Sequence, residues 1–149
     1  MKFFEIISLT VIVIAVSLSL SGCHEDIVVS IKKVAISRCT EKHPIRKETV
    51  RSIMNNEHVP DDHEVKCWLS CIMKVLGMLK DGKINWEHSK NITKYGFSEE
   101  NKAKVDKITE ICQAEVSQGE NDECQLAYSA AVCKMNNWKE LGLPKGNWE

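Results

Sequence analysis

The 149-residue chain is 43% hydrophobic and 28% charged, with seven glycines and three prolines, a composition typical of one globular domain and not of a disordered or fibrous chain. Its formal net charge is −1, and acidic and basic residues are interspersed, so the sequence predicts no sustained electropositive face and no nucleic-acid partner. No stable membrane association is predicted either.

The first 22 residues have the pattern of a secretory signal peptide. An apolar run from Ile6 to Leu20 is followed by small residues up to Gly22. The run is shorter than the roughly 18–20 apolar residues that a membrane span requires, so a transmembrane anchor is the weaker interpretation. We therefore expect a secreted, extracellular domain that comprises residues 23–149.

Apolar residues at three- and four-residue steps predict helices through the mature chain, which makes the expected fold class all-α with about six helices. The first helix follows Asp26 and places Ile31, Ala35 and Cys39 on one stripe. The second is predicted to start at Pro44, with an apolar face of Val50, Ile53 and Met54, and to end at Asn55-Asn56.

The segment that begins at Pro60 is the most clearly amphipathic part of the chain. Asp61, Asp62 and Glu64 lie where acidic side chains stabilise a helix N-terminus. The predicted helix continues until Asp81-Gly82, and its apolar face consists of Val65, Trp68, Leu69, Ile72, Val75, Leu76 and Leu79.

Three more helices are predicted in the second half. Residues 83–95 form a short one, and Ser98 caps a long one that ends at Gly119. Asn121-Asp122 opens the last, which is expected to end near Asn136 and to leave residues 137–149 as a C-terminal tail. The segment after Asp81 is not a calcium loop, because its glycine is misplaced and Ile92 stands where a bidentate Glu is required.

The seven cysteines are the most informative residue type, and the first, Cys23, lies at the signal boundary. Its removal leaves six, an even number suited to an oxidising compartment. If Cys23 stays, its thiol could pair between chains. Residues 20–23 also fit a bacterial lipobox, in which Cys23 would be acylated, but such a short match is common by chance.

The other six cysteines are separated by 27, 3, 40, 11 and 8 residues. This spacing resembles that of the six-cysteine odorant-binding proteins of insects, and the resemblance covers nearly the whole mature chain. It extends to the residues around the cysteines, which are Pro60-Asp61-Asp62, Lys66-Cys67-Trp68, Cys71-Ile72-Met73-Lys74, Gly77 and Asp81-Gly82-Lys83-Ile84.

The resemblance implies a compact helical bundle around an internal apolar cavity, stapled by three interlocked disulfides. The implied pairs are Cys39–Cys71, Cys67–Cys124 and Cys112–Cys133. A competing use of the same residues is a zinc site, because His63, Cys67 and Cys71 fall at four-residue spacing on one helical face. Oxidation is favoured in a secreted chain, so neither a metal nor a cofactor is predicted.

The resemblance also implies a carrier that binds small hydrophobic molecules, such as odorants, pheromones or similar volatiles, and transports them through extracellular fluid. Tyr128 could hydrogen-bond a polar end of the ligand. Seven residues are the candidates for the pocket lining, although each also fits a plain core role: Met73, Leu76, Val105, Ile108, Ile111, Tyr128 and Val132.

Two features are candidate modifiers of binding. The tail residues Trp138, Leu141 and Leu143 could form a wall or lid of the pocket, and the histidines His58, His63 and His88 could sense pH. Asn91-Ile92-Thr93 is a glycosylation sequon, which in a secreted protein makes Asn91 a weak candidate for modification.

No catalytic residues are predicted, so the chain is not expected to be an enzyme. A secreted phospholipase A2, for example, needs an adjacent Cys-Cys pair followed by a His-Asp pair, and neither occurs. A membrane chemoreceptor is the candidate protein partner, and a monomer or weak homodimer is expected. The alternative function is the same fold acting away from smell, as a lipid or hormone carrier or as a protein-binding defence or salivary factor.

Overall fold

The computed structural model describes residues 27–119 and 122–148, so the expected signal peptide and Cys23 lie outside the described residues. The chain divides into two compact units, and the described part of the first, residues 27–33, is helical. The second unit begins at Val34 and contains the hydrophobic core and three disulfides.

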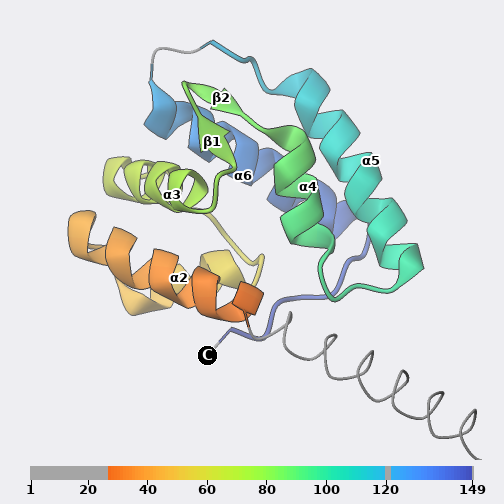
Figure 1. Cartoon of the computed structure of the whole chain (residues 1–149), viewed down its shortest axis with the longest axis horizontal. Coiled ribbons are helices and arrows are strands. Elements are labelled where there is room, and N and C mark those ends of the chain that lie inside the picture. The colour runs from red at the N-terminus through yellow and green to blue at the C-terminus, as the bar shows by residue number, and fades with distance from the viewer. Residues whose placement is uncertain (1–26, 120–121, 149) are drawn as a thin grey trace, which may run out of the picture. The chain divides into compact units, whose positions relative to one another are not determined.

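The second unit is helical except for one short hairpin (Figure 1). Residues 34–42 are helical, and the hairpin of β1 (Leu79–Lys80) and β2 (Lys83–Ile84) is antiparallel with Leu79 opposite Ile84. This confirms the predicted all-α class with about six helices. The remaining helices are α2 (Lys47–Met54), α3 (His63–Val75), α4 (Trp86–Lys94), α5 (Glu99–Glu115) and α6 (Glu123–Glu140).

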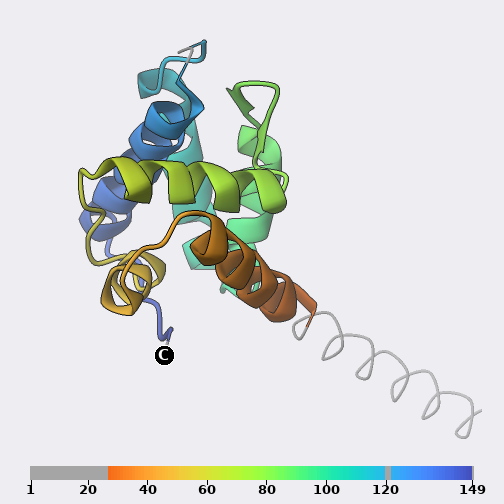
Figure 2. The same ribbon diagram turned by 90° about the vertical axis from the view of Figure 1, so that its left-hand side faces the viewer.

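The helices of this unit surround one apolar core. α3 packs along α6, and α5 packs against both α4 and α6. Figure 2 shows the same unit from the side, with the C-terminal end of the chain next to α2, as in Figure 1. Trp68 on α3 and Leu126 on α6 are fully buried between these elements, and burial of such side chains is the main favourable term in the folding of the unit.

Side-chain caps set the starts of the long helices where the sequence predicted them. Asp62 Oδ1 accepts hydrogen bonds from the backbone N–H groups of Glu64 and Val65, at 3.0 and 3.2 Å. Ser98 caps α5 and Asp122 caps α6 in the same manner. Each cap satisfies N–H groups that have no partner inside the helix.

The predicted end of the third helix is wrong. α3 ends at Val75, and Leu79 lies in β1 instead of on the helical stripe. The turn of the hairpin explains the difference, because Asp81 and Gly82 have φ values of 51° and 69°. Two successive positive φ angles define a type I′ turn, which Asp-Gly favours and which joins two strands directly.

Other predicted boundaries also differ. Lys83 and Ile84 form β2, so the helix predicted from Lys83 begins at Trp86, and the helix predicted to end at Gly119 ends at Glu115. α2 starts at Lys47, three residues after Pro44, and its first turn is closed by a 3.1 Å bond from Val50 N–H to the Arg46 carbonyl. α6 continues beyond Asn136 to Glu140, so the predicted tail begins too early. The extension is stabilised by burial of Trp138, which is 7% exposed.

Candidate ligand-binding site

Three disulfides cross-link the helices of the second unit. Cys39–Cys71 joins helical residues 34–42 to α3, Cys67–Cys124 joins α3 to α6, and Cys112–Cys133 joins α5 to α6. These are the pairs that the resemblance implies. Because Cys67 and Cys71 both form disulfides, the alternative zinc site loses two of its three ligands.

Six of the seven predicted pocket residues lie in or against the core. Met73, Val105 and Ile108 are buried in it, Ile111 is half-buried, and the other three pack against it from partly exposed positions; these are Leu76, Tyr128 and Val132. They come from α3, its C-terminal end, α5 and α6. That they line one ligand pocket stays a prediction.

Tyr128 has a polar neighbour that the sequence did not predict. Lys66 Nζ lies 4.7 Å from the centroid of the Tyr128 ring, and Lys66 also forms an ion pair with Asp61 at 2.6 Å. The hydrogen bond to Asp61 is the main cause that raises the pKa of Lys66 above its ordinary value. The ammonium therefore stays charged over the ring face, where a cation is attracted by the π system.

An open groove of about 800 Å³ lies where helical residues 34–42, α3 and the start of α6 meet. We call it the disulfide groove, because both Cys67–Cys124 and Cys71 of the Cys39–Cys71 bond line it. None of the seven predicted pocket residues lines it. Its lining consists of Arg38, Glu41, Lys42, His43, Cys67, Ser70, Cys71, Lys74, Val75, Glu123 and Cys124.

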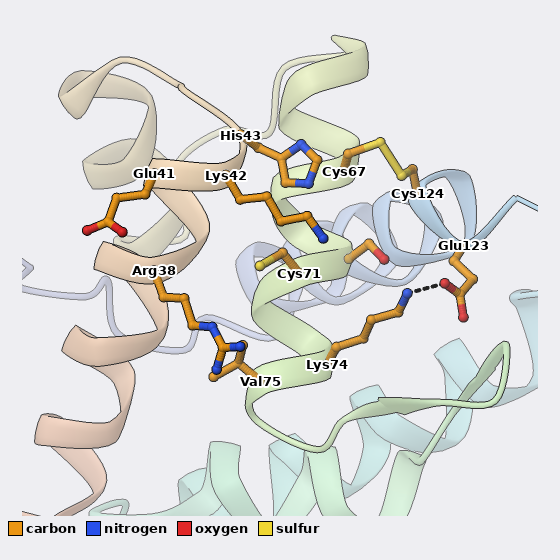
Figure 3. A pocket seen from close by; sticks show the side chains of 11 residues that line it. Arg38, Glu41, Lys42, His43, Cys67, Cys71, Lys74, Val75, Glu123 and Cys124 are labelled. Atoms are coloured by element: carbon orange, nitrogen blue, oxygen red, sulfur yellow. Dashed lines mark hydrogen bonds and ion pairs between the residues drawn. A yellow bond between two sulfur atoms is a disulfide. The ribbon is translucent and has the colours of Figure 1, made fainter.

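The charges of the groove are unevenly arranged (Figure 3). Lys74 forms an ion pair with Glu123, whereas Arg38 and Lys42 reach from their helix toward α3. The carboxylate of Glu41 points away from α3. Neither Arg38 nor Lys42 has an ion-pair partner among the residues that the structure describes.

The groove also contains one serine hydroxyl. Ser70 on α3 is 4% exposed as a residue and lines the groove. Within residues 27–119 and 122–148 its hydroxyl has no hydrogen-bond partner, and since Trp86 Nε1 is the one buried side-chain polar atom there without a partner, the Ser70 hydroxyl is open to the groove. His43, at the upper edge in Figure 3, is engaged elsewhere, because its Nδ1 lies 3.3 Å from Glu64 Oε2.

A second hollow, of about 370 Å³, lies between α4 and α5. Its lining is mainly polar and includes Glu87, Lys90 and Asp106, and Lys90 forms an ion pair with Glu87 at 2.6 Å. The hydrogen bond to Lys90 is the main cause that lowers the pKa of Glu87. The buried indole N–H of Trp86, at the edge of this hollow, has no acceptor in the described part of the chain.

The C-terminal tail is attached to the end of α2 and to α6. Asn55 accepts a 2.6 Å hydrogen bond from Trp148 N–H at its Oδ1 and donates from Nδ2 to the Trp148 carbonyl at 3.2 Å. Trp138 Nε1 donates to the Pro144 carbonyl at 2.9 Å, and Leu143 is 7% exposed. These contacts make part of the tail a fixed wall of the core, and a role as a lid stays a prediction.

Two of the candidate pH-sensing histidines, His63 and His88, lie close to other polar or sulfur atoms, and the sequon lies on α4. His88 Nε2 lies 2.9 Å from the Leu76 carbonyl, which follows α3, and His63 Nε2 lies 3.8 Å from Cys67 Sγ. Asn91 is exposed on α4. The hydroxyl of Thr93, the third sequon residue, donates to the Ser89 carbonyl at 2.7 Å. Both pH sensing and glycosylation stay predictions.

None of the helices in residues 27–119 and 122–148 is long and apolar enough to cross a membrane. No group of three or more His, Cys, Asp or Glu side chains in the described ranges is arranged to hold a metal ion.

The disulfide groove was not predicted, although the sequence contains a signal for it. Arg38 and Lys42 are four residues apart, Lys42 lies three residues after Cys39, and Lys74 lies three after Cys71. Residues three or four apart share the face of a helix. The Cys39–Cys71 bond therefore brings three basic side chains to one place that periodicity alone could not identify.

The sequence is similar to a known protein family and to individual insect proteins. A sequence model of the PBP/GOBP family matches residues 24–137. General odorant-binding protein 19d of Drosophila melanogaster is 29% identical over 122 residues, which cover 80% of each chain. The family match begins near the predicted start of the mature domain and ends within α6.

Solved structures have the same fold. Odorant binding protein 5 of Apis mellifera has a TM-score of 0.62 at 26% identity, over 77% of this chain and 89% of that one. Odorant Binding Protein 7 of Anopheles gambiae, solved in complex with an azo compound, has a TM-score of 0.56 at 22% identity, over 73% and 84%. The second similarity is at the level of fold.

Proposed function

This chain belongs to the PBP/GOBP family, and on that premise we propose that it is a secreted carrier that binds small hydrophobic molecules inside its helical bundle and transports them through extracellular fluid. The observation that carries the proposal is the family match over residues 24–137. The azo compound bound by the Anopheles gambiae relative is in keeping with it. Odorants, pheromones and similar volatiles are the proposed ligand class.

The binding region that we propose lies between the C-terminal half of α3, α5 and α6. Its side chains are Met73, Leu76, Val105, Ile108, Ile111, Tyr128 and Val132. Apolar burial contributes about 25 cal/mol per Å² of ligand surface, so affinity rises with the apolar area of the ligand. Met73 is unbranched and repacks easily, which suits a pocket that accepts several shapes.

The test is a competition experiment. The protein, with its three disulfides formed, is titrated with an environment-sensitive apolar dye, which is then displaced by long-chain alcohols, aldehydes, esters and terpenoids. We expect saturable one-to-one binding and competitive displacement. Correctly bridged protein that shows no saturable binding would contradict the proposal.

A conservative variant tests the position of the pocket. Tyr128→Phe removes one hydroxyl and keeps the ring that Lys66 contacts. If Tyr128 orients the ligand, the variant binds a long-chain alcohol about fivefold more weakly, the value of one hydrogen bond, and binds the alkane of the same length unchanged. Equal affinity for the alcohol in both proteins would remove Tyr128 from the proposed site.

The proposal extends to localisation and partners. We propose that residues 1–22 are removed on secretion, that the carrier is a monomer or weak homodimer, and that a membrane chemoreceptor receives the ligand. Mass spectrometry of the protein purified from culture medium gives the cleavage site directly. Protein that stays inside the cell would contradict this part.

A further inference from the structure

We propose that the disulfide groove is a second binding site, outside the apolar interior, and that it takes a small organic anion, namely a carboxylate on a short apolar chain. The site is formed by Arg38, Lys42 and Ser70 above the sulfur atoms of two disulfides. It depends on different residues from the carrier pocket proposed above.

Charge is the first argument. Lys74 is neutralised by Glu123, which leaves the positive charges of Arg38 and Lys42 unpaired within the described residues and directed toward α3 (Figure 3). A guanidinium presents parallel N–H groups that match the two oxygens of a carboxylate. An anion between these side chains supplies the negative charge that the described residues do not supply to Arg38 and Lys42.

The hydroxyl of Ser70 is a second polar group of the groove. It has no partner within the described residues and is open to the groove, so it is available to donate a hydrogen bond to a group there. A carboxylate oxygen accepts a hydrogen bond from a hydroxyl and attracts the two cations at the same time. Ser70 therefore adds a neutral donor to the two positive charges.

Shape and rigidity favour a small amphiphilic molecule. The volume of about 800 Å³ lies within the range of about 300–1,000 Å³ that is usual for small-ligand pockets. Val75 and the disulfide sulfurs supply apolar contacts for a short chain. Since two disulfides fix all three walls, little order is lost on binding.

The experiment compares decanoate with 1-decanol, its uncharged analogue, by isothermal titration calorimetry on the disulfide-bonded protein. The test variant is Arg38→Gln/Lys42→Gln. The matched control is Lys80→Gln/Lys83→Gln, which removes the same charge from two exposed hairpin residues that line neither hollow.

We expect the test variant to bind decanoate at least about tenfold more weakly and the control to bind it as the original protein does, because hydrogen bonds to a charged group are the strong ones. Ser70→Ala is expected to weaken the binding of decanoate about threefold or more. Decanoate should shift the amide NMR signals of residues 38–42 and 70–74. Dye binding to the interior stays unchanged in all variants, which shows that they fold.

Two results would overturn the proposal. If decanoate displaces the interior dye and binds both double variants equally, the carboxylate occupies the carrier pocket and not the groove. If octaglutamate binds and decanoate does not, the groove takes an acidic protein segment instead of a small anion. If the dye does not bind but decanoate binds as expected, the carrier function is contradicted and the result for the groove still holds.

Discussion

Among single residues, Asp62 has a defined energetic role because one carboxylate oxygen accepts from two backbone N–H groups at the start of α3. Asp62→Ala is expected to lower the free energy of unfolding by about 1 kcal/mol, since it leaves those donors without their cap. Urea denaturation followed by far-UV circular dichroism measures the change.

The adjacent Asp61 is the control for Asp62. Asp61→Ala removes the same charge but only an exposed ion pair with Lys66, in which Asp61 is 69% exposed. Its expected effect is within about 0.5 kcal/mol, as for most surface ion pairs. If the two variants lost equal stability, the charge near the helix start and not the cap would be the source.

Gly146 permits the close approach of the tail to α2. A Cβ atom there would lie 2.6 Å from the Met54 carbonyl oxygen and 2.9 Å from Asn55 Cα, which are backbone atoms that cannot move aside easily. Gly146→Ala is expected to cost about 1–3 kcal/mol, as overpacking does, and to accelerate hydrogen exchange at Trp148 N–H, which is bonded to Asn55. The control Asn147→Ala, at the exposed neighbouring residue, should change neither the free energy of unfolding nor the hydrogen exchange at Trp148 N–H.

At the scale of elements, the disulfide between α5 and α6 closes the shortest of the three loops, with a sequence separation of 21. On the chain-entropy model, Cys112→Ala/Cys133→Ala lowers the free energy of unfolding by about 3 kcal/mol. The loss of stability should affect both joined helices most, so hydrogen exchange in α5 and α6 increases more than in α2. Uniform loss of protection would mean that the unit opens only as a whole.

The elements also show what sequence could predict. Helix starts were correct at Asp62 and Ser98, where a capping side chain follows a loop, because a cap is a local interaction. The start of α4 was predicted too early, at Lys83, although Asn85 caps it. The predicted helix ends were less accurate than the starts. Leu79 fits both a helical stripe and a two-residue strand, and only the backbone of the Asp81–Gly82 turn selects the strand. The continuation of α6 depends on burial of Trp138 by distant residues, which no local pattern contains.

The prediction of sites from the sequence was limited in the same way. The cysteine spacing led through a family resemblance to the pairing that the structure has, because three covalent bonds strongly restrict the fold. The disulfide groove was not predicted, since Arg38 and Ser70 belong to separate helices and become neighbours only in three dimensions. Side-chain pairings of this kind require the tertiary structure.

At the scale of the whole molecule, ligand binding and stability are linked. A ligand that binds the folded carrier and not the unfolded chain raises the free energy of unfolding by RT ln(1 + [L]/Kd), which is about 2.7 kcal/mol at a ligand concentration of 100 Kd. For a domain of this size the corresponding rise in Tm is about 10 °C. Scanning calorimetry with the tightest long-chain alcohol from the dye competition measures it.

The same experiment separates interior burial from adsorption to the surface. Ethanol at the same concentration presents too little apolar area to gain much from the pocket, so it should leave Tm unchanged. A long-chain alcohol that displaces the dye yet fails to raise Tm must bind unfolded chains equally well, because only preferential binding to the folded state stabilises it. That result would place the alcohol on exposed apolar surface and contradict an enclosed carrier site, whereas a rise that grows with ligand concentration supports it.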